Sequence, residues 1–368
     1  AIQLGQTPAR LRMIRVNMNT RHINHETPIT IPKLLKNINS NYATAHFGKW
    51  GMDSTPATLG YEHSDGKTKN QDGVFNNKYP GTQWRNNTSE DPKKIFSTTN
   101  KAINFIEKQA ASATPFFIQV SHYAVHSDVF SLKSTLDKYA GKKKGKYQKH
   151  IGFAAMTEDL DTGLGKLLDR VTELGLDENT YIIYTSDNGA VPVMPPRVGF
   201  YKEGSNTPLR RGKWDAMEGG IRVPFILTGP NVEAGIISDV PINFTDILPT
   251  IIDLAGKKTS YSNELDGGSF KSVLLNKGNG KVKRNSKNFI FHVPYENSIG
   301  LKRAHSAIIQ DNFKLIKFYD NNQILLIDLN SDIQERNNLA IKLPDKAKKL
   351  EEELEDYLHD VKAPRWKP

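Results

Sequence analysis

Alternating helical and strand patterns constrain this chain more than any other feature of its sequence. Apolar residues recur at helical spacing over 150–174, and the pattern stops at Gly175. A short buried strand, Thr180-Tyr-Ile-Ile-Tyr-Thr-Ser186, follows directly, and further strand and helix patterns alternate on both sides of it. Such alternation is typical of an α/β fold, in which helices cover both faces of a mostly parallel or mixed sheet.

The pattern changes after about residue 285 of the 368 in the chain. Short strand-like runs separated by Asp-Asn turns replace the alternation, and a helix over 344–361 follows them with leucines on its buried side. We therefore predict an α/β domain over 1–285 and a smaller C-terminal antiparallel α+β subdomain over 286–368. Two polar segments, 54–90 and 133–149, are predicted to be surface loops.

The composition excludes several classes of protein. The chain contains no cysteine, which excludes disulfide frameworks, thiolate metal sites and cysteine nucleophiles. Its apolar runs fall far short of the ~20 residues that span a bilayer, so we expect no transmembrane helix. Lysine and arginine (50) outnumber aspartate and glutamate (40), and the net charge of +10 favours polyanionic partners. Nucleic acid is not expected among them, because the lysines form no recognisable motif and the aromatic residues do not interleave with them.

Polar side chains follow several of the predicted strands. Asp187 and Asn188 come directly after a buried strand and offer a carboxylate and an amide oxygen, which are suitable ligands for Ca²⁺ or Mg²⁺. An Asx turn is the alternative for the same two residues. Lys49, His126 and Lys213 follow other predicted strands or lie in long loops. Singly, each is more often a solvated lysine or a hydrogen-bonded structural histidine. Together they could bind an anionic ester and neutralise its developing charge.

Several motifs follow one another along nearly the whole chain: Tyr42-Ala-Thr-Ala-His-Phe-Gly-Lys-Trp50, Pro115-Phe-Phe-Ile-Gln-Val-Ser121 with Ala124-Val-His126, Ser186-Asp-Asn-Gly189, the run from Arg211 to Phe225, Asp246-Ile-Leu-Pro-Thr250 and Leu265-Asp-Gly267. In content and order they resemble the type I sulfatase family, the formylglycine-dependent enzymes of the alkaline-phosphatase-like superfamily. The resemblance implies an alkaline-phosphatase-like mixed sheet and a secreted or periplasmic hydrolase of sulfate esters in a sulfated carbohydrate or polysaccharide.

The resemblance also implies a role for each candidate residue. Asp187 and Asn188 would be Ca²⁺ ligands. Lys49 and Lys213 would hold and neutralise the sulfate group, and His126 would assist departure of the leaving oxygen.

One motif departs from the family pattern. Gln6-Thr-Pro-Ala-Arg10 matches the family's Cys/Ser-x-Pro-x-Arg segment and places Gln6 at the nucleophile position. An amide cannot be oxidised to formylglycine, whereas Arg10 of the same segment remains a candidate catalytic residue. The acidic pair of the family's first strand is also absent, so that strand is expected to be missing. A non-catalytic, sulfatase-like protein that binds polyanions is therefore the alternative interpretation.

Overall fold

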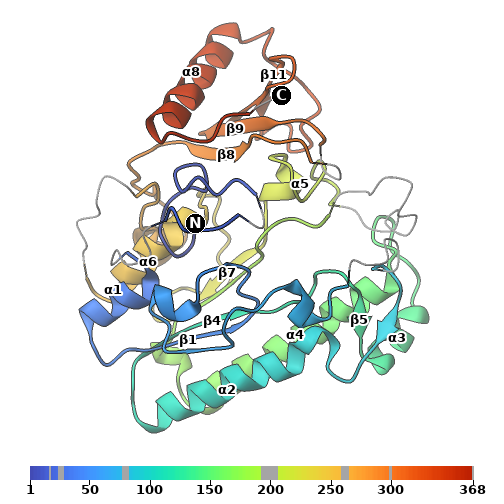
Figure 1. Cartoon of the computed structure of the whole chain (residues 1–368), viewed down its shortest axis with the longest axis vertical. Coiled ribbons are helices and arrows are strands. Elements are labelled where there is room, and N and C mark those ends of the chain that lie inside the picture. The colour runs from blue at the N-terminus through green and yellow to red at the C-terminus, as the bar shows by residue number, and fades with distance from the viewer. Residues whose placement is uncertain are drawn as a thin grey trace. The chain divides into compact units, whose positions relative to one another are not determined.

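The computed structural model divides the chain into two compact units (Figure 1). The first unit comprises residues 1–18, 182–193 and 206–368, and the second comprises 19–181 and 194–205. The predicted domain boundary at residue 285 lies inside the first unit and stays a prediction. Within these units the structure describes residues 1–15, 18–23, 29–76, 83–191, 206–257, 265–297 and 301–366.

A parallel sheet with the strand order β2-β1-β4 forms part of the second unit. β1 (Ala43–Gly48) pairs with β4 (Phe116–Ser121) along its whole length, and β2 (His63–Ser64) pairs with the other edge of β1. Because parallel strands run in the same direction, Gly48 and Ser121 lie opposite each other at the carboxyl ends of their strands.

Shorter elements lie between and after the strands of this sheet along the chain. β3 (Asn87–Thr88) pairs with β5 (Phe130–Ser131) in a second parallel sheet. Two short 3₁₀ helices, η1 (Pro56–Leu59) and η2 (Asn70–Gly73), interrupt the predicted loop over 54–90.

The helices described in the second unit include α1 (Ile31–Ile38), α2 (Ile95–Ala111), α3 (Lys133–Ala140) and α4 (Ile151–Glu173). The apolar stripe predicted over 150–174 is confirmed as α4.

The prediction of a loop over 133–149 is wrong at its start, where α3 forms. The cause is a tertiary contact that lysine content does not reveal. Asp159 of α4 is buried and accepts hydrogen bonds from the Leu132 amide at 2.8 Å and from the Thr135 hydroxyl at 2.7 Å. These bonds hold the first turn of α3 against α4.

The first unit contains the antiparallel pair β6 (Ile182–Thr185) and β7 (Phe225–Thr228). Its short helices include α5 (Glu218–Ile221), α6 (Ile247–Leu254) and α7 (Lys271–Leu275).

Buried Asp246 stands immediately before α6. Both of its carboxylate oxygens accept hydrogen bonds from the Arg284 guanidinium, at 2.7 and 2.8 Å. The Gly268 amide donates to the same carboxylate at 2.9 Å. The aspartate of the Asp246-Ile-Leu-Pro-Thr250 motif therefore joins three separate segments of the first unit.

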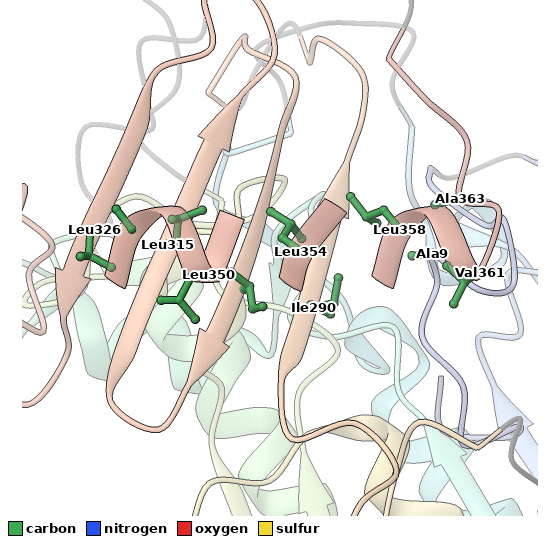
Figure 2. Close-up of a cluster of buried hydrophobic side chains, with 11 residues drawn as sticks. Ala9, Ile290, Leu315, Leu326, Leu350, Leu354, Leu358, Val361 and Ala363 are labelled. Carbon is green, nitrogen blue, oxygen red and sulfur yellow. The ribbon is translucent and has the colours of Figure 1, made fainter. Parts of the chain in front are cut away.

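The C-terminal part of the first unit is an antiparallel sheet covered by a helix. The strand order is β11-β10-β9-β8, made by β8 (Phe289–Val293), β9 (His305–Gln310), β10 (Phe313–Phe318) and β11 (Ile324–Asp328). Leu350, Leu354 and Leu358 of α8 (Pro344–Asp360) gather with Leu315 and Leu326 of the strands, each no more than 2% exposed (Figure 2). Each buried leucine contributes roughly 1.5–3 kcal/mol. The predicted meander and its leucine-lined helix are confirmed.

A fully buried lysine links this sheet to α5. The ammonium of Lys314 on β10 lies 3.0 Å from a carboxylate oxygen of Glu218 and 2.7 Å from one of Glu335, and none of these three side chains is more than 4% exposed. The Glu335 carboxylate also accepts the amide of Glu218 at 2.8 Å. Burial raises the pKa of the Glu335 carboxyl, and Lys314 opposes that shift.

Replacing Lys314 by methionine should destabilise the fold by about 3–5 kcal/mol, because two carboxylates lose their buried counter-ion. The deficit should shrink between about pH 7 and pH 5. Without Lys314 the folded pKa of Glu335 rises further above its unfolded value, so protonation on acidification favours the folded state. Urea unfolding at both pH values measures the change.

The matched control is Lys348→Met, which removes a lysine that is 76% exposed on α8 and should change stability by less than about 0.5 kcal/mol. A Lys314→Met deficit equal to that of the control, or one that does not depend on pH, would contradict the buried ion pairs.

Candidate functional site

The candidate residues fall into both units. Arg10, Asp187, Asn188 and Lys213 belong to the first unit. Lys49 and His126 belong to the second.

Asp187 and Asn188 follow the carboxyl end of β6. The Ser186 hydroxyl donates to the Asn188 carbonyl at 3.0 Å, and the Asn188 side-chain amide donates to the Gly189 carbonyl at 2.9 Å. These local bonds hold the turn and direct the nitrogen of the Asn188 amide toward the backbone. Asp187 is exposed, and within the described part of the chain its carboxylate forms no ion pair. Its oxygens therefore remain suited to an external cation.

A close approach of two backbone segments fixes this turn. The Gly189 amide donates to the Gly220 carbonyl at 2.9 Å. A Cβ atom at Gly189 would lie only 1.8 Å from the carbonyl oxygen of Gly219, and backbone atoms cannot move aside as a side chain can. Glycine is thus required at the end of the Ser186-Asp-Asn-Gly189 motif.

The same contact brings Lys213 next to the turn. The Lys213 amide donates to the Ala190 carbonyl at 2.9 Å, so its backbone lies beside the residues that immediately follow Asp187 and Asn188. Lys213 is half-buried, and its ammonium lies 5.5 Å from the centre of the Trp214 ring. The first unit therefore brings three of the sequence-predicted residues onto adjoining loops.

Two buried carboxylates hold the segment that follows Lys213. The Arg211 guanidinium pairs with buried Asp215 at 2.5 Å, and Asp215 also accepts the amide of Leu301 at 2.7 Å. Beyond Lys213, Glu218 is bound by Lys314 of β10. The loop is consequently anchored after its lysine, by Asp215 to the segment between β8 and β9 and by Glu218 to β10.

In the second unit, Lys49 occupies the carboxyl end of β1. Its amide donates to the Ser121 carbonyl at 2.7 Å. The preceding Gly48 has a φ of +93°, and a Cβ there would lie 2.1 Å from the same carbonyl oxygen, so only glycine permits this approach.

Behind Lys49, a histidine is enclosed by aromatic rings. His46 is 1% exposed, its Nε2 lies 3.1 Å from the Ser121 hydroxyl, and its ring meets Trp50 edge to face. Burial lowers the pKa of His46 to about 4, so the ring is neutral at pH 7. His46 is therefore a buried histidine of β1.

His126 shares a backbone acceptor with a buried lysine. Its Nδ1 lies 2.6 Å from the Ser127 carbonyl, so in the neutral ring the proton resides on Nδ1. The ammonium of Lys93 donates to that same carbonyl at 3.2 Å. The His126 ring also meets Phe75 edge to face, which restricts its orientation.

Lys93 is a residue that the sequence did not single out. It is 1% exposed, and burial lowers its pKa to about 8. The nearby carboxylate of Asp128 opposes this shift, and the positive charge of Lys49 adds to it. Lys93 therefore lies within electrostatic reach of Lys49 while touching the backbone that orients His126. It lies in an Asp-Pro-Lys-Lys run, where lysines are usually solvated, and only its burial distinguishes it.

Arg10 is engaged in the fold of the first unit. Its guanidinium makes three hydrogen bonds to the Asp266 carboxylate, between 2.7 and 3.2 Å. Thr7 adds a bond from its amide to Asp266 at 2.8 Å and a hydroxyl contact to Tyr357 of α8 at 2.6 Å. The segment after Gln6 thus ties the Leu265-Asp-Gly267 motif to α8, and a catalytic role for Arg10 stays a prediction.

The chemistry of these residues can be tested against the groups that sulfatases use. Oxygen donors of Asp187 and Asn188 fit calcium, although they supply two of the six to eight ligands it takes. Among the described residues no cluster of three or more acidic or histidine side chains could hold a metal. Gln6 does not fit formylglycine, because its amide cannot be oxidised to that aldehyde.

Comparison with protein families identifies the fold. The sulfatase family model matches residues 2–257, and the model of the N-sulphoglucosamine sulphohydrolase C-terminal region matches 213–364. The first match alone spans well over half of the chain. The chain belongs to the sulfatase family, which confirms the resemblance in its motifs.

Curated relatives match over parts of their length. Human steryl-sulfatase is 35% identical over 195 residues, covering 53% of this chain and 31% of that protein. A sulfatase of Formosa agariphila is 28% identical over 302 residues, covering 74% of this chain and 52% of the relative. Mouse N-acetylgalactosamine-6-sulfatase is 32% identical over 178 residues, covering 48% of this chain and 32% of that protein. The chain thus spans about a third to a half of these relatives.

Solved structures support the α/β fold with its C-terminal antiparallel sheet. The crystal structure of Ps i-CgsB has a TM-score of 0.76 and 23% identity, and covers 100% of this chain and 82% of that one. The crystal structure of Ps i-CgsB in complex with k-i-k-neocarrahexaose has a TM-score of 0.74 and 22% identity, and it also covers 100% of this chain and 82% of that one. In the described segments, every helix is too short or too polar to cross a bilayer.

The pKa of Lys93 predicts how stability depends on pH. Between about pH 8 and pH 10 the folded state holds Lys93 neutral, while the unfolded chain keeps it protonated. The free energy of unfolding of the wild type should therefore rise with pH relative to Lys93→Met, by up to about 1.4 kcal/mol per pH unit.

Chemical denaturation of both proteins across this range measures the difference, and Lys94→Met, at an exposed neighbouring lysine, is the control. A difference in the free energy of unfolding between the wild type and Lys93→Met that stays constant from about pH 8 to pH 10 would contradict a lowered pKa of Lys93.

Proposed function

We propose that this protein binds sulfated carbohydrates and hydrolyses their sulfate esters. The observation that carries the proposal is the hydrogen bond from the Lys213 amide to the Ala190 carbonyl, which sets the backbone of a half-buried lysine beside the Asp187–Asn188 turn in a chain of the sulfatase family. The charge of +10 supports a polyanionic substrate, because it attracts such a chain over a long range. We extend the proposal to a secreted or periplasmic location, where polysaccharides are degraded.

In this proposal each residue has a defined task. The ammonium groups of Lys213 and Lys49 bind sulfate oxygens and neutralise the charge that develops on them. The Ser127 carbonyl keeps one proton of His126 on Nδ1, so a proton passed to the leaving oxygen is the second proton of the imidazolium, carried on Nε2. Asp187 and Asn188 would hold a calcium ion, whose charge would polarise a bound sulfate group.

Gln6 supports a second candidate function. If the segment Gln6-Thr-Pro-Ala-Arg10 occupies the place of the family's nucleophile motif, the chain has an amide where the covalent catalyst should be. The protein would then be a sulfatase-like polyanion-binding protein that retains its lysines without the chemistry. Binding and sulfate release must therefore be measured separately.

Replacing Lys213 by alanine tests the proposed hydrolysis. Release of inorganic sulfate from a sulfated oligosaccharide should fall about a hundredfold, because one charged donor to the transition state is lost. Lys342→Ala, which removes an exposed lysine from the same unit, should keep the wild-type rate. Ion chromatography of released sulfate and direct titration of binding provide the two readouts.

The outcomes separate the candidate functions. Sulfate-selective binding without release, weakened by Lys213→Ala and by Lys49→Ala, favours the binding protein. Affinity that is equal for sulfated and carboxylated oligosaccharides of the same charge, and that is lost in 1 M salt, where the Debye length is only ~3 Å, would contradict both.

Calcium should raise the melting temperature of the protein, because a ligand that binds only the folded state stabilises it. Asp187→Ala should abolish most of this rise, since it removes the charged ligand. Thermal unfolding with CaCl₂, and with NaCl at equal ionic strength, measures the effect. A rise that persists unchanged in Asp187→Ala would place calcium elsewhere.

A further inference from the structure

A polar cavity adjoins the loop that carries Lys213. Two hollows of the first unit, of about 240 and 400 Å³, share Arg210 and Arg336 in their walls. Arg210 lies three residues before Lys213, so their Cα atoms are at most about 11 Å apart. The carbonyl of Arg210 also accepts the amide of Gly219 at 2.9 Å, which fixes the cavity wall to the glycine contact beside Asp187 and Asn188.

Two arginines of this cavity have no carboxylate partner among the described residues. The Arg210 guanidinium donates to the backbone carbonyl of Glu335 at 2.5 Å, which orients it without neutralising its charge. Exposed Arg336 forms no side-chain ion pair in the described chain, although its backbone amide donates to Asp332 at 2.8 Å. Arg303, which also lines the cavity, is neutralised by Asp320 through two bonds of 2.7 Å.

Glu335 is an acidic residue in the wall of the cavity, but its carboxylate already pairs with a lysine. The carboxylate of Glu335 is turned away from solvent and paired with Lys314, with 0% of its side chain exposed. The cavity wall therefore carries the positive charges of Arg210 and Arg336, and buried ion pairs of Lys314 hold this wall in place. A guanidinium matches the geometry of sulfate and carboxylate oxygens with paired N–H donors.

We propose that this cavity binds a second anionic group, a sulfate or a carboxylate, of the same polysaccharide whose sulfate ester is held at Lys213. The inference rests on the proposed function. The predominantly polar lining suits a hydrated sugar, and the short distance along the loop suits a neighbouring sugar of the chain. The cavity would thus make the protein selective for substrates charged on adjacent sugars.

The test compares two probes by calorimetric titration: a disulfated tetrasaccharide and the monosulfated monosaccharide. In the double variant Arg210→Gln/Arg336→Gln the Kd of the tetrasaccharide should rise about tenfold, and its advantage over the monosaccharide should fall correspondingly. Lys348→Gln/Lys349→Gln removes two positive charges from exposed positions of α8 in the same unit and should change either Kd less than twofold. A tetrasaccharide with one sulfate and one carboxylate distinguishes the two anions.

The single variant Arg336→Gln controls for misfolding of the double variant, because it changes only an exposed side chain. It should raise the Kd of the tetrasaccharide about threefold. Equal effects of the arginine and lysine double variants would overturn the inference, as would a tetrasaccharide that binds the wild type no better than the monosaccharide. The proposed function fails separately, if Lys213→Ala leaves the Kd of both probes unchanged.

Discussion

The arrangement of the first unit depends on the buried ammonium of Lys314. It sits between Glu218, at the start of α5, and Glu335, which follows β11. Because α5 supplies the glycines that contact Gly189, this one cation connects the C-terminal sheet to the turn that carries Asp187 and Asn188. A buried ion pair gives little net stability, but its geometry is demanding, and here it fixes the position of a loop.

Periodic patterns in the sequence predicted most of the large elements. The apolar stripe of α4 and the leucines of α8 specify helices whose buried faces are evident from spacing alone. The prediction failed for α3, where polar residues form a helix because Asp159 caps its first turn from another element. A contact of that kind depends on residues distant in the sequence, so local periodicity does not reveal it.

In the candidate site, too, some features are evident from local sequence and others depend on contacts between distant residues. The structure places Asp187 and Asn188 at the carboxyl end of β6 and Lys213 on an adjoining loop of the same unit, while their shared role in a site stays a prediction. No sequence pattern pointed to Lys93, because lysines in a charged run are usually solvated and its burial is visible only after folding. Asp266 belongs to a family motif, but its motif did not indicate that its partner would be Arg10.

The bonds of the N-terminal segment also determine when the first unit can be completed during synthesis. Arg10 reaches Asp266, 256 residues later, and Thr7 reaches Tyr357 after 350 residues. The second unit is nearly continuous from residue 19 to 181, so its contacts become available early on the ribosome. The long-range bonds of Arg10 and Thr7, by contrast, must wait until Asp266 and Tyr357 have been synthesised.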